Sequence, residues 1–168
     1  MRVIKLFLIS IVVLFLLITA ISSLLPAEIR VSRAVDISAN NSEVAKFLND
    51  LSGWKNRNEF VKPATAIRVS GDSLISNELT VVLNRRNPAD ISSSWMQGNH
   101  PILPANFIIF STRGNTTLQW YFTCHFKWYP WEKLGSMVYD KQLGSPMEQS
   151  LQNLKLLIEQ GKNDVERQ

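Results

Sequence analysis

Cysteine and histidine are scarce in this chain of 168 residues, and their scarcity removes several classes of site. Cys124 is the only cysteine, so an internal disulfide and a cysteine-rich metal site are both excluded. The two histidines, His100 and His125, have no carboxylate or nucleophile arranged near them in the sequence. Two histidines without further ligands do not predict a metal site. We therefore expect no metal and no cofactor.

An excess of charge of one sign is also lacking once the first residues are set aside. The whole chain has 18 basic and 14 acidic side chains and a formal net charge of +4. Arg2 and Lys5 precede a long apolar run, so the remainder holds 16 basic residues against 14 acidic ones, a net charge of +2. Proteins that bind nucleic acid concentrate Lys and Arg on one face. This composition argues against a nucleic-acid partner.

A single long hydrophobic run stands out in the chain. Residues 6–25 contain no charge, no proline and no glycine, and Pro26 ends the run. Twenty helical residues extend roughly 30 Å, which is the thickness of the hydrocarbon core of a bilayer. A helix satisfies its own backbone hydrogen bonds there. Residues 1–26 are therefore predicted to form a transmembrane anchor that contacts the membrane through residues 3–25.

Two other interpretations of this run are less favoured. A cleaved signal peptide has a shorter apolar region of about 7–15 residues and a small-residue cleavage site, of which Thr19-Ala20 is a poor version. A lipoprotein needs a cysteine near the end of the run, and the sequence has none there. We expect an uncleaved, single-pass anchor.

The orientation of the anchor is predicted from the charges that flank it. Arg2 and Lys5 lie in a short N-terminal tail without acidic residues, which favours a cytoplasmic N-terminus. Arg30 and Arg33 follow the run and nearly balance that count, but long folded domains cross membranes largely regardless of charge. The domain is therefore expected on the outer side, either periplasmic or otherwise extracytoplasmic.

Beyond the anchor, the hydrophobic pattern changes to a period of two. Segment 28–37 places Ile29, Val31, Val35 and Ile37 on one face and charged residues on the other, as in a half-buried strand. A helix is expected over residues 41–51 and a short one over residues 54–60. Further strands are expected at residues 67–69, 74–83, 91–96, 102–110 and 118–126, with turns or loops at residues 70–72, 84–88 and 112–115.

The C-terminal part is predicted to be helical. Residues 133–142 form a lead-in, and Gly144-Ser145-Pro146 indicates a joint, with Pro146 at the first position of a new helix. An apolar stripe follows at spacings of three and four residues: Met147, Leu151, Leu154, Leu157 and Ile158. Gly161 is expected to end this helix, and residues 162–168 to form a polar tail.

The order of these elements resembles the START-like SRPBCC superfamily, which includes polyketide cyclases, dehydrases and lipid-transport proteins. The resemblance rests on residues 24–33 continuing through 44–54, and on residues 117–158, especially 118–120, 135–140, Gly144 and 151–155. Together these segments cover about half of the domain. The central strands match only in general pattern, and Trp54 is followed by polar residues where such proteins often have tryptophan and proline.

The resemblance implies an α+β, helix-grip fold over residues 27–161, in which a curved antiparallel sheet wraps round a long C-terminal helix. Such a fold leaves space for a hydrophobic small molecule or lipid. The candidate cavity-wall residues are Phe107, Ile109, Trp120, Phe122, Phe126, Met147 and Leu151. Apolar side chains on these faces more often pack into a core than contact a ligand. A membrane-anchored binding domain is the favoured function.

Two alternative functions stay open. One is a cyclase-, dehydrase- or isomerase-type enzyme that uses the same cavity, and the other is a ligand-free interaction module of the cell envelope. Polar groups inside the cavity would favour the enzyme, and a core without a void would favour the interaction module.

No catalytic residue is assigned from the sequence. His100 stands in a loop-like stretch, His125 lies on the polar phase of its strand, and Cys124 lies on the apolar phase, where a free cysteine behaves as a small hydrophobe. Asp140 and Glu148 are expected to be solvated, as is the turn that contains Arg85 and Arg86.

An aromatic cluster stands between the last strand and the helix. Trp128, Tyr129 and Trp131 are candidates for the membrane interface, where amphipathic rings are favoured. The alternative, that these rings pack against the end of the domain, is the preferred interpretation.

Overall fold

The computed structural model describes residues 2–24, 28–87, 89–98, 103–112, 115–125 and 130–165. Its elements, in chain order, are α1 (Arg2–Leu24), β1 (Glu28–Ile37), α2 (Asn41–Asn49), η1 (Leu51–Gly53), α3 (Trp54–Arg57), β2 (Arg68–Ser70), β3 (Ser73–Ile75), β4 (Leu79–Asn87), β5 (Asp90–Gln97), β6 (Leu103–Thr112), β7 (Asn115–His125) and α4 (Pro130–Val165). The described strands form one sheet in the order β1-β7-β6-β5-β4-β3-β2, and every neighbouring pair is antiparallel.

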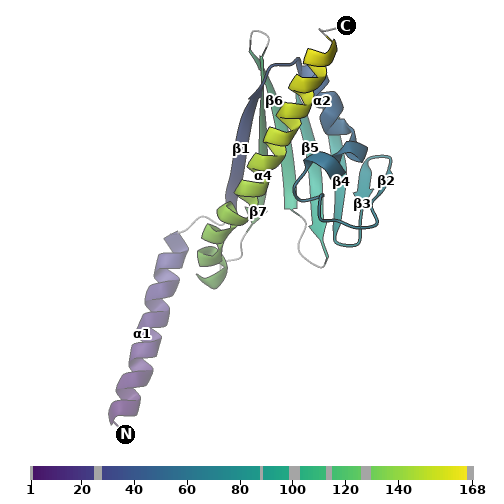
Figure 1. Cartoon of the computed structure of the whole chain (residues 1–168). Helices are drawn as coiled ribbons and strands as arrows, with labels where there is room; N and C mark the ends of the chain where they lie inside the picture. The colour runs from purple at the N-terminus through teal and green to yellow at the C-terminus, as the bar shows by residue number, and fades with distance from the viewer. Residues whose placement is uncertain are drawn as a thin grey trace.

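Helix α4 crosses one face of this sheet, and α2, η1 and α3 lie beside it (Figure 1). This is the helix-grip arrangement that the sequence predicts. Buried and more exposed side chains alternate along β1 and β7, which gives the sheet one apolar face for α4 to cover. On β1 the buried side chains are Val31, Val35 and Ile37. In β7 the buried phase runs through Leu118, Trp120, Phe122 and Cys124. These side chains meet the buried stripe of α4, formed by Met147, Leu151, Leu154 and Ile158.

The short helices are held together by a buried guanidinium. Arg57 is 6% exposed, and its Nη2 donates to the backbone carbonyls of Phe47 and Asp50. Its Nη1 lies 3.7 Å from the carboxylate of Asp50. Burial lowers the pKa of Arg57, and the charge of Asp50 opposes that shift. Gly53 makes room for this arrangement, because a Cβ built there would lie 2.2 Å from Arg57 Nη1.

Two predictions for the central strands are wrong. Residues 74–83 do not form one strand, because Ser76 accepts and donates hydrogen bonds with Leu79 in a tight turn between β3 and β4. Residues 84–88 do not form a loop, since β4 continues through Arg85 and Arg86, which pair with β5. An irregularity between Leu83 and Arg85 lets the strand run on despite its polar sequence.

The predicted joint and end of the C-terminal helix are also wrong. Helix α4 runs unbroken from Pro130 to Val165, with Pro146 inside it, and Gly161 is helical. Gly144 allows α4 to approach β1, because a Cβ there would lie 2.1 Å from an Arg33 guanidinium nitrogen. That guanidinium donates to Asp140 of α4 over 3.1 Å. Packing against the sheet thus keeps the helix continuous where the local sequence signals a break.

Helix α1 extends away from the domain (Figure 1). It has 23 residues, and a stretch of 18 of them has a mean hydropathy of 2.9, so the helix is long and apolar enough to cross a membrane. Ser22, near its C-terminal end, is its buried residue, and α1 contacts α4. The remaining apolar side chains of α1 are exposed over most of its length.

Candidate ligand-binding cavity

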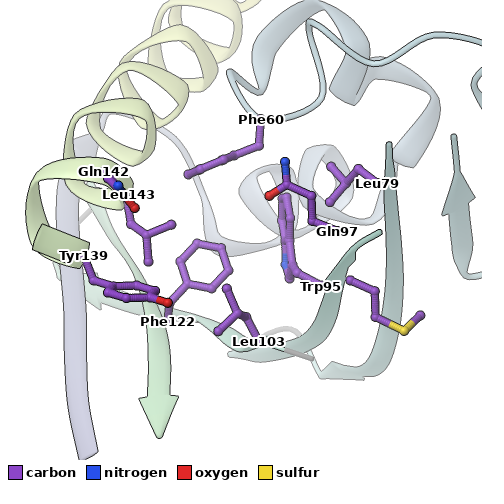
Figure 2. Close-up of a pocket in the computed structure, with 10 residues that line it drawn as sticks. Phe60, Leu79, Trp95, Gln97, Leu103, Phe122, Tyr139, Gln142 and Leu143 are labelled. Atoms are coloured by element: carbon purple, nitrogen blue, oxygen red, sulfur yellow. The ribbon is translucent and has the colours of Figure 1, made fainter. Parts of the chain in front are cut away.

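A cavity of about 260 Å³ lies between the first half of α4 and the sheet. It is built where the ends of β5, β6 and β7 come close to α4 and to the segment after α3. The described residues that line it are Phe60, Leu79, Trp95, Met96, Gln97, Leu103, Phe122, Tyr139, Gln142 and Leu143. Figure 2 shows Tyr139, Gln142 and Leu143 of α4 on one side and Trp95, Gln97 and Leu79 on the other, with Phe122 between them.

Aromatic rings in mutual contact form the back of the cavity. The ring centroid of Trp95 lies 5.4 Å from that of Phe122 and 5.7 Å from that of Phe60. Both of these pairs are edge-to-face, a favoured arrangement for aromatic rings. Trp120 stands behind them, 5.7 Å from Trp95, and stacks on Phe107 at 5.0 Å. The wall is therefore supported by a second layer of rings and keeps its shape.

The polar groups of the lining are neutral. Gln97 and Gln142 are exposed at the rim, and the side chain of Tyr139 is half-buried. The indole N–H of Trp95 is already satisfied, since it donates to Ser93 Oγ over 2.9 Å. No Asp, Glu, Lys, Arg or His is among the described lining residues. Such a surface suits an uncharged apolar molecule and disfavours the burial of a charge.

The predicted wall residues that the structure describes fall into three groups. Phe122 lines the cavity. Phe107, Trp120 and Leu151 border a separate space of about 20 Å³, enough for about one water molecule. Ile109 and Met147 are buried in the core, away from both spaces.

The side chains of four predicted site residues are not described by the structure. Phe126, Trp128 and Tyr129 lie outside the described residues. Trp131 is in α4, but its side chain is not described.

Sequence reasoning missed most of the lining. Trp95 carries a usable signal, because it follows Ile91 and Ser93 on the buried phase of β5. Phe60 stands at the end of the predicted short helix, residues 54–60, and nothing in the sequence places it opposite Trp95. Tyr139 belongs to the predicted helical lead-in, residues 133–142, without an assigned face, and Leu143 lies between that lead-in and the predicted joint. Their role depends on the continuity of α4, which the local sequence does not indicate.

The candidate reactive groups do not assemble into a catalytic site among the described residues. His125 is exposed at the end of β7, with Nε2 3.6 Å from a carboxylate oxygen of Glu28. Cys124 is buried, and burial raises the pKa of its thiol. Asp140 pairs with Arg33, and Glu148 is exposed. His100 lies outside the described residues. Within the described part of the chain, no three His, Cys, Asp or Glu residues gather as metal ligands.

Fold and cavity together define a helix-grip protein with an apolar interior space. Its fold is that of START-like proteins. A START superfamily protein from Mycobacterium smegmatis is 19% identical, and the match covers 78% of this chain and 97% of that one with a TM-score of 0.55. Norcoclaurine synthase from Thalictrum flavum is 8% identical over 78% of this chain and 93% of that one, with a TM-score of 0.58.

A third similar structure is that of a di-domain protein. The di-domain ARO/CYC protein StfQ of the steffimycin biosynthetic pathway is 12% identical, with a TM-score of 0.62. The match covers 82% of this chain and 52% of StfQ, so this chain spans about half of that protein. No family model and no curated protein matches the sequence. At these identities the likeness establishes the fold.

Proposed function

We propose that this protein is a membrane-anchored binding protein that holds an uncharged hydrophobic small molecule or lipid portion in the cavity beneath α4. The observation that carries the proposal is a preformed space whose described lining residues are mainly aromatic and aliphatic and include no charged side chain. Emptying such a surface of water is favourable, by about 25 cal/mol for each Å² of apolar surface buried. A ligand-free interaction module is disfavoured, because its core would have no such space.

The size of the cavity narrows the class of ligand. An engineered protein cavity of about 150 Å³ binds benzene, and pockets for drug-sized molecules begin at about 300 Å³. The volume here, about 260 Å³, lies between these values. The favoured ligand therefore has one or two rings, or a single short acyl chain. A whole diacyl lipid would place most of its surface outside.

We assign α1 as the membrane anchor, with its N-terminus in the cytoplasm and the domain on the outer side. The 23 residues of α1 extend about 34 Å as a helix, which is enough to cross a hydrocarbon core of about 30 Å. Its exposed apolar side chains need a non-aqueous environment. The cytoplasmic N-terminus follows from Arg2 and Lys5, as argued from the sequence.

Photolabelling of the full chain in phosphatidylcholine vesicles tests the binding function. The probe is 3-trifluoromethyl-3-phenyldiazirine, a neutral molecule with one aromatic ring, and labelled residues are located by peptide mass spectrometry. We expect the probe to label cavity residues such as Phe122 and Leu103. This labelling should fall when excess naphthalene is added as a competitor. Labelling of α1 by probe dissolved in the bilayer should not fall, which makes α1 an internal control.

Two variants of the same helix sharpen this test. Leu143→Trp fills the cavity, and we expect it to abolish the competed labelling. Leu157→Trp introduces the same side chain on α4 at a position that is 42% exposed and away from the cavity, and labelling should persist. Labelling that is unaffected by naphthalene, or equal in both variants, would refute the binding function. Mass spectrometry of molecules that co-purify with the unmodified protein then identifies the natural ligand.

An enzyme of cyclase, dehydrase or isomerase type is the second candidate. Two of the similar structures are a synthase and an ARO/CYC protein by their names, and here Tyr139, Gln97 and Gln142 bring polar groups to the cavity. A neutral phenol and two amides can orient a reactive substrate and stabilise developing charge. Under this alternative, Tyr139→Phe should lower turnover of the identified ligand at least tenfold and leave its binding unchanged. Equal turnover in both proteins would favour binding alone.

A further inference from the structure

We propose that the cavity opens toward the bilayer that holds α1, so that the ligand passes between membrane and cavity at the anchor side of the sheet. This inference rests on the proposed function, and it adds a membrane-facing entrance and a lipid surface as the partner of that entrance. Four observations carry it: the register of the strands, the length of the linker, the contact between α1 and α4, and the chemistry of the rim.

The register of the strands places the cavity at the end of the sheet where α1 is attached. β1 begins there with Glu28, which pairs with His125 at the end of β7. One residue inward, Ile29 pairs with Cys124. On β6, Ala105 pairs with Phe122, so Leu103 lies two residues closer to that same end, and it pairs with Trp95 of β5. Phe122, Leu103 and Trp95 all line the cavity.

The linker holds this end of the sheet close to the membrane. Helix α1 ends at Leu24 and β1 begins at Glu28, so four backbone steps separate them. A fully extended chain covers at most about 14 Å in four steps. The headgroup layer is about 5–7 Å thick on each side of the hydrocarbon core. With α1 in the bilayer, the start of β1 is therefore confined to the headgroup layer or to the few ångströms above it.

The contact between α1 and α4 adds to this constraint. Ser22, near the end of α1, is buried, and α1 contacts α4, whose first half covers the cavity. In Figure 1, α1 meets the domain at the end opposite the C-terminus, beside the starting turns of α4. The cover of the cavity and the end of the anchor are thus neighbours.

The rim suits an interface with lipid. Its exposed residues among those described, Gln97 and Gln142, are neutral, and the half-buried residues beside them include Leu103 and Leu143. The described rim residues therefore bring no charge that would have to enter the hydrocarbon beneath the headgroups, where burying a charge is costly. A hydrophobic ligand is itself concentrated in the bilayer, so an entrance on this side spares it a passage through water.

A distance-dependent quenching experiment on the full chain tests the position of the entrance. Cysteine is introduced singly as Gln97→Cys at the rim and as Ser42→Cys at the start of α2, beyond the other end of β1. Cys124 is buried and stays unlabelled in the folded protein. Each variant carries a bimane fluorophore in phosphatidylcholine vesicles that contain lipids with a nitroxide on the headgroup.

The two sites give a sharp contrast because β1 is long. Ten strand residues extend about 33 Å, which exceeds the reach of contact quenching. We expect strong quenching at Gln97→Cys and little at Ser42→Cys. Equal quenching at both sites would mean that the domain lies flat on the bilayer, and no quenching at Gln97→Cys would mean that the entrance faces water. Either result overturns the proposal.

Lengthening the linker separates this proposal from the binding function. Ten prolines inserted after Leu25 form a semi-rigid spacer of about 31 Å, which lifts the domain off the headgroups. We expect quenching at Gln97→Cys to be lost, while photolabelling of the cavity at equilibrium stays as in the unmodified protein. Quenching that survives the insertion would contradict a position set by the linker. Loss of competed photolabelling in the unmodified chain would instead refute the binding function and leave the quenching result standing on its own.

Discussion

The interior beneath α4 differs between its middle and its anchor side. In the middle, Trp54, Phe107 and Trp120 fill the space between helix and sheet, and a void of only about 20 Å³ is left. At the anchor side, Trp95, Phe122 and Leu143 leave about 260 Å³ empty. Both parts are built from the same strands and the same helix, on the same buried phase.

This difference indicates that the cavity exists because the short helices pack against the aromatic rings in the middle of the sheet and not against those at the anchor side. Behind the middle, α2, η1 and α3 close the structure, with Trp54 donating to Leu48 and Arg57 holding the turn. At the anchor side, none of these short helices lines the cavity, and its described cover is Phe60 together with Tyr139, Gln142 and Leu143 of α4. We therefore assign stability to the middle and binding to the anchor side, and the following variants test that division.

The largest contrast is expected between Trp120→Ala and Leu143→Ala. Trp120 is 1% exposed and contacts several rings, so its removal leaves a large void and should lower the free energy of unfolding by about 3–5 kcal/mol. Leu143 already borders an empty space and is half-buried, so its truncation should cost about 1 kcal/mol. Denaturant unfolding followed by near-ultraviolet circular dichroism measures both.

A neighbouring position provides the control for Trp120. Gln119 lies on the opposite phase of β7, and its amide donates to Ser32 Oγ over 2.9 Å. Gln119→Ala should cost about 0.5–1.5 kcal/mol, the usual net value of one hydrogen bond. If Leu143→Ala destabilised the protein as strongly as Trp120→Ala, the anchor side would contribute as much to stability as the middle. The assignment of stability to the middle and binding to the anchor side would then be wrong.

Two glycines allow a second contrast of intermediate size. A Cβ at Gly53 would collide with Arg57, which is buried and held by two carbonyls, so Gly53→Ala should lower stability by about 1–3 kcal/mol. A Cβ at Gly144 would collide with Arg33, whose guanidinium makes a solvent-exposed ion pair and can turn away. Gly144→Ala should change stability by no more than about 1 kcal/mol, since alanine also favours the helix. Thermal unfolding measures the stability of both variants. Equal losses of stability would contradict the conclusion that Arg57 is held rigidly while Arg33 can move.

The smallest expected effect is a dependence on pH. Asp50 accepts a hydrogen bond from Ser52, which lowers the pKa of Asp50, and Arg57 adds to that shift. Lys62 lowers the pKa of Glu59, and the backbone N–H of Thr65 lowers that of Glu78. Carboxylates with lowered pKa values stabilise the fold above their unfolded values, near 4, and lose this contribution as the pH falls through the folded values.

The free energy of unfolding should thus be level from pH 7 to about pH 5 and decline below that. The described cavity lining has no carboxylate or histidine, so photolabelling of protein that is still folded should not follow this decline. Denaturant titrations between pH 3 and pH 7, compared with photolabelling over the same range, check both statements. A cavity that loses its ligand above the pH at which stability begins to fall would contradict a neutral site.

The sequence predicts the frame of this molecule better than its cavity. Period-two alternation correctly assigns β1 and β7, because a one-residue slip would turn every apolar side chain of such a strand to water. It cannot separate Trp120 from Phe122, which share one face of β7, although only Phe122 lines the cavity. The difference depends on other parts of the chain: Trp54 borders the small space beside Trp120, and Tyr139 and Leu143 border the cavity beside Phe122. Local signals failed similarly at Gly144 and Pro146, where tertiary packing keeps α4 intact.

Pro146 separates the turns of α4 that cover the cavity from the turns that pack into the core. Proline has no backbone N–H, so the carbonyl of Gln142, one turn earlier, lacks its usual partner in the helix. A helix bends most easily where one of its backbone hydrogen bonds is missing. After Pro146, Met147, Leu151 and Leu154 fix α4 to the sheet, whereas the turns before it cover the cavity. A small rotation of those first turns about Pro146 would therefore change the size of the cavity while the buried residues that follow Pro146 stay in place.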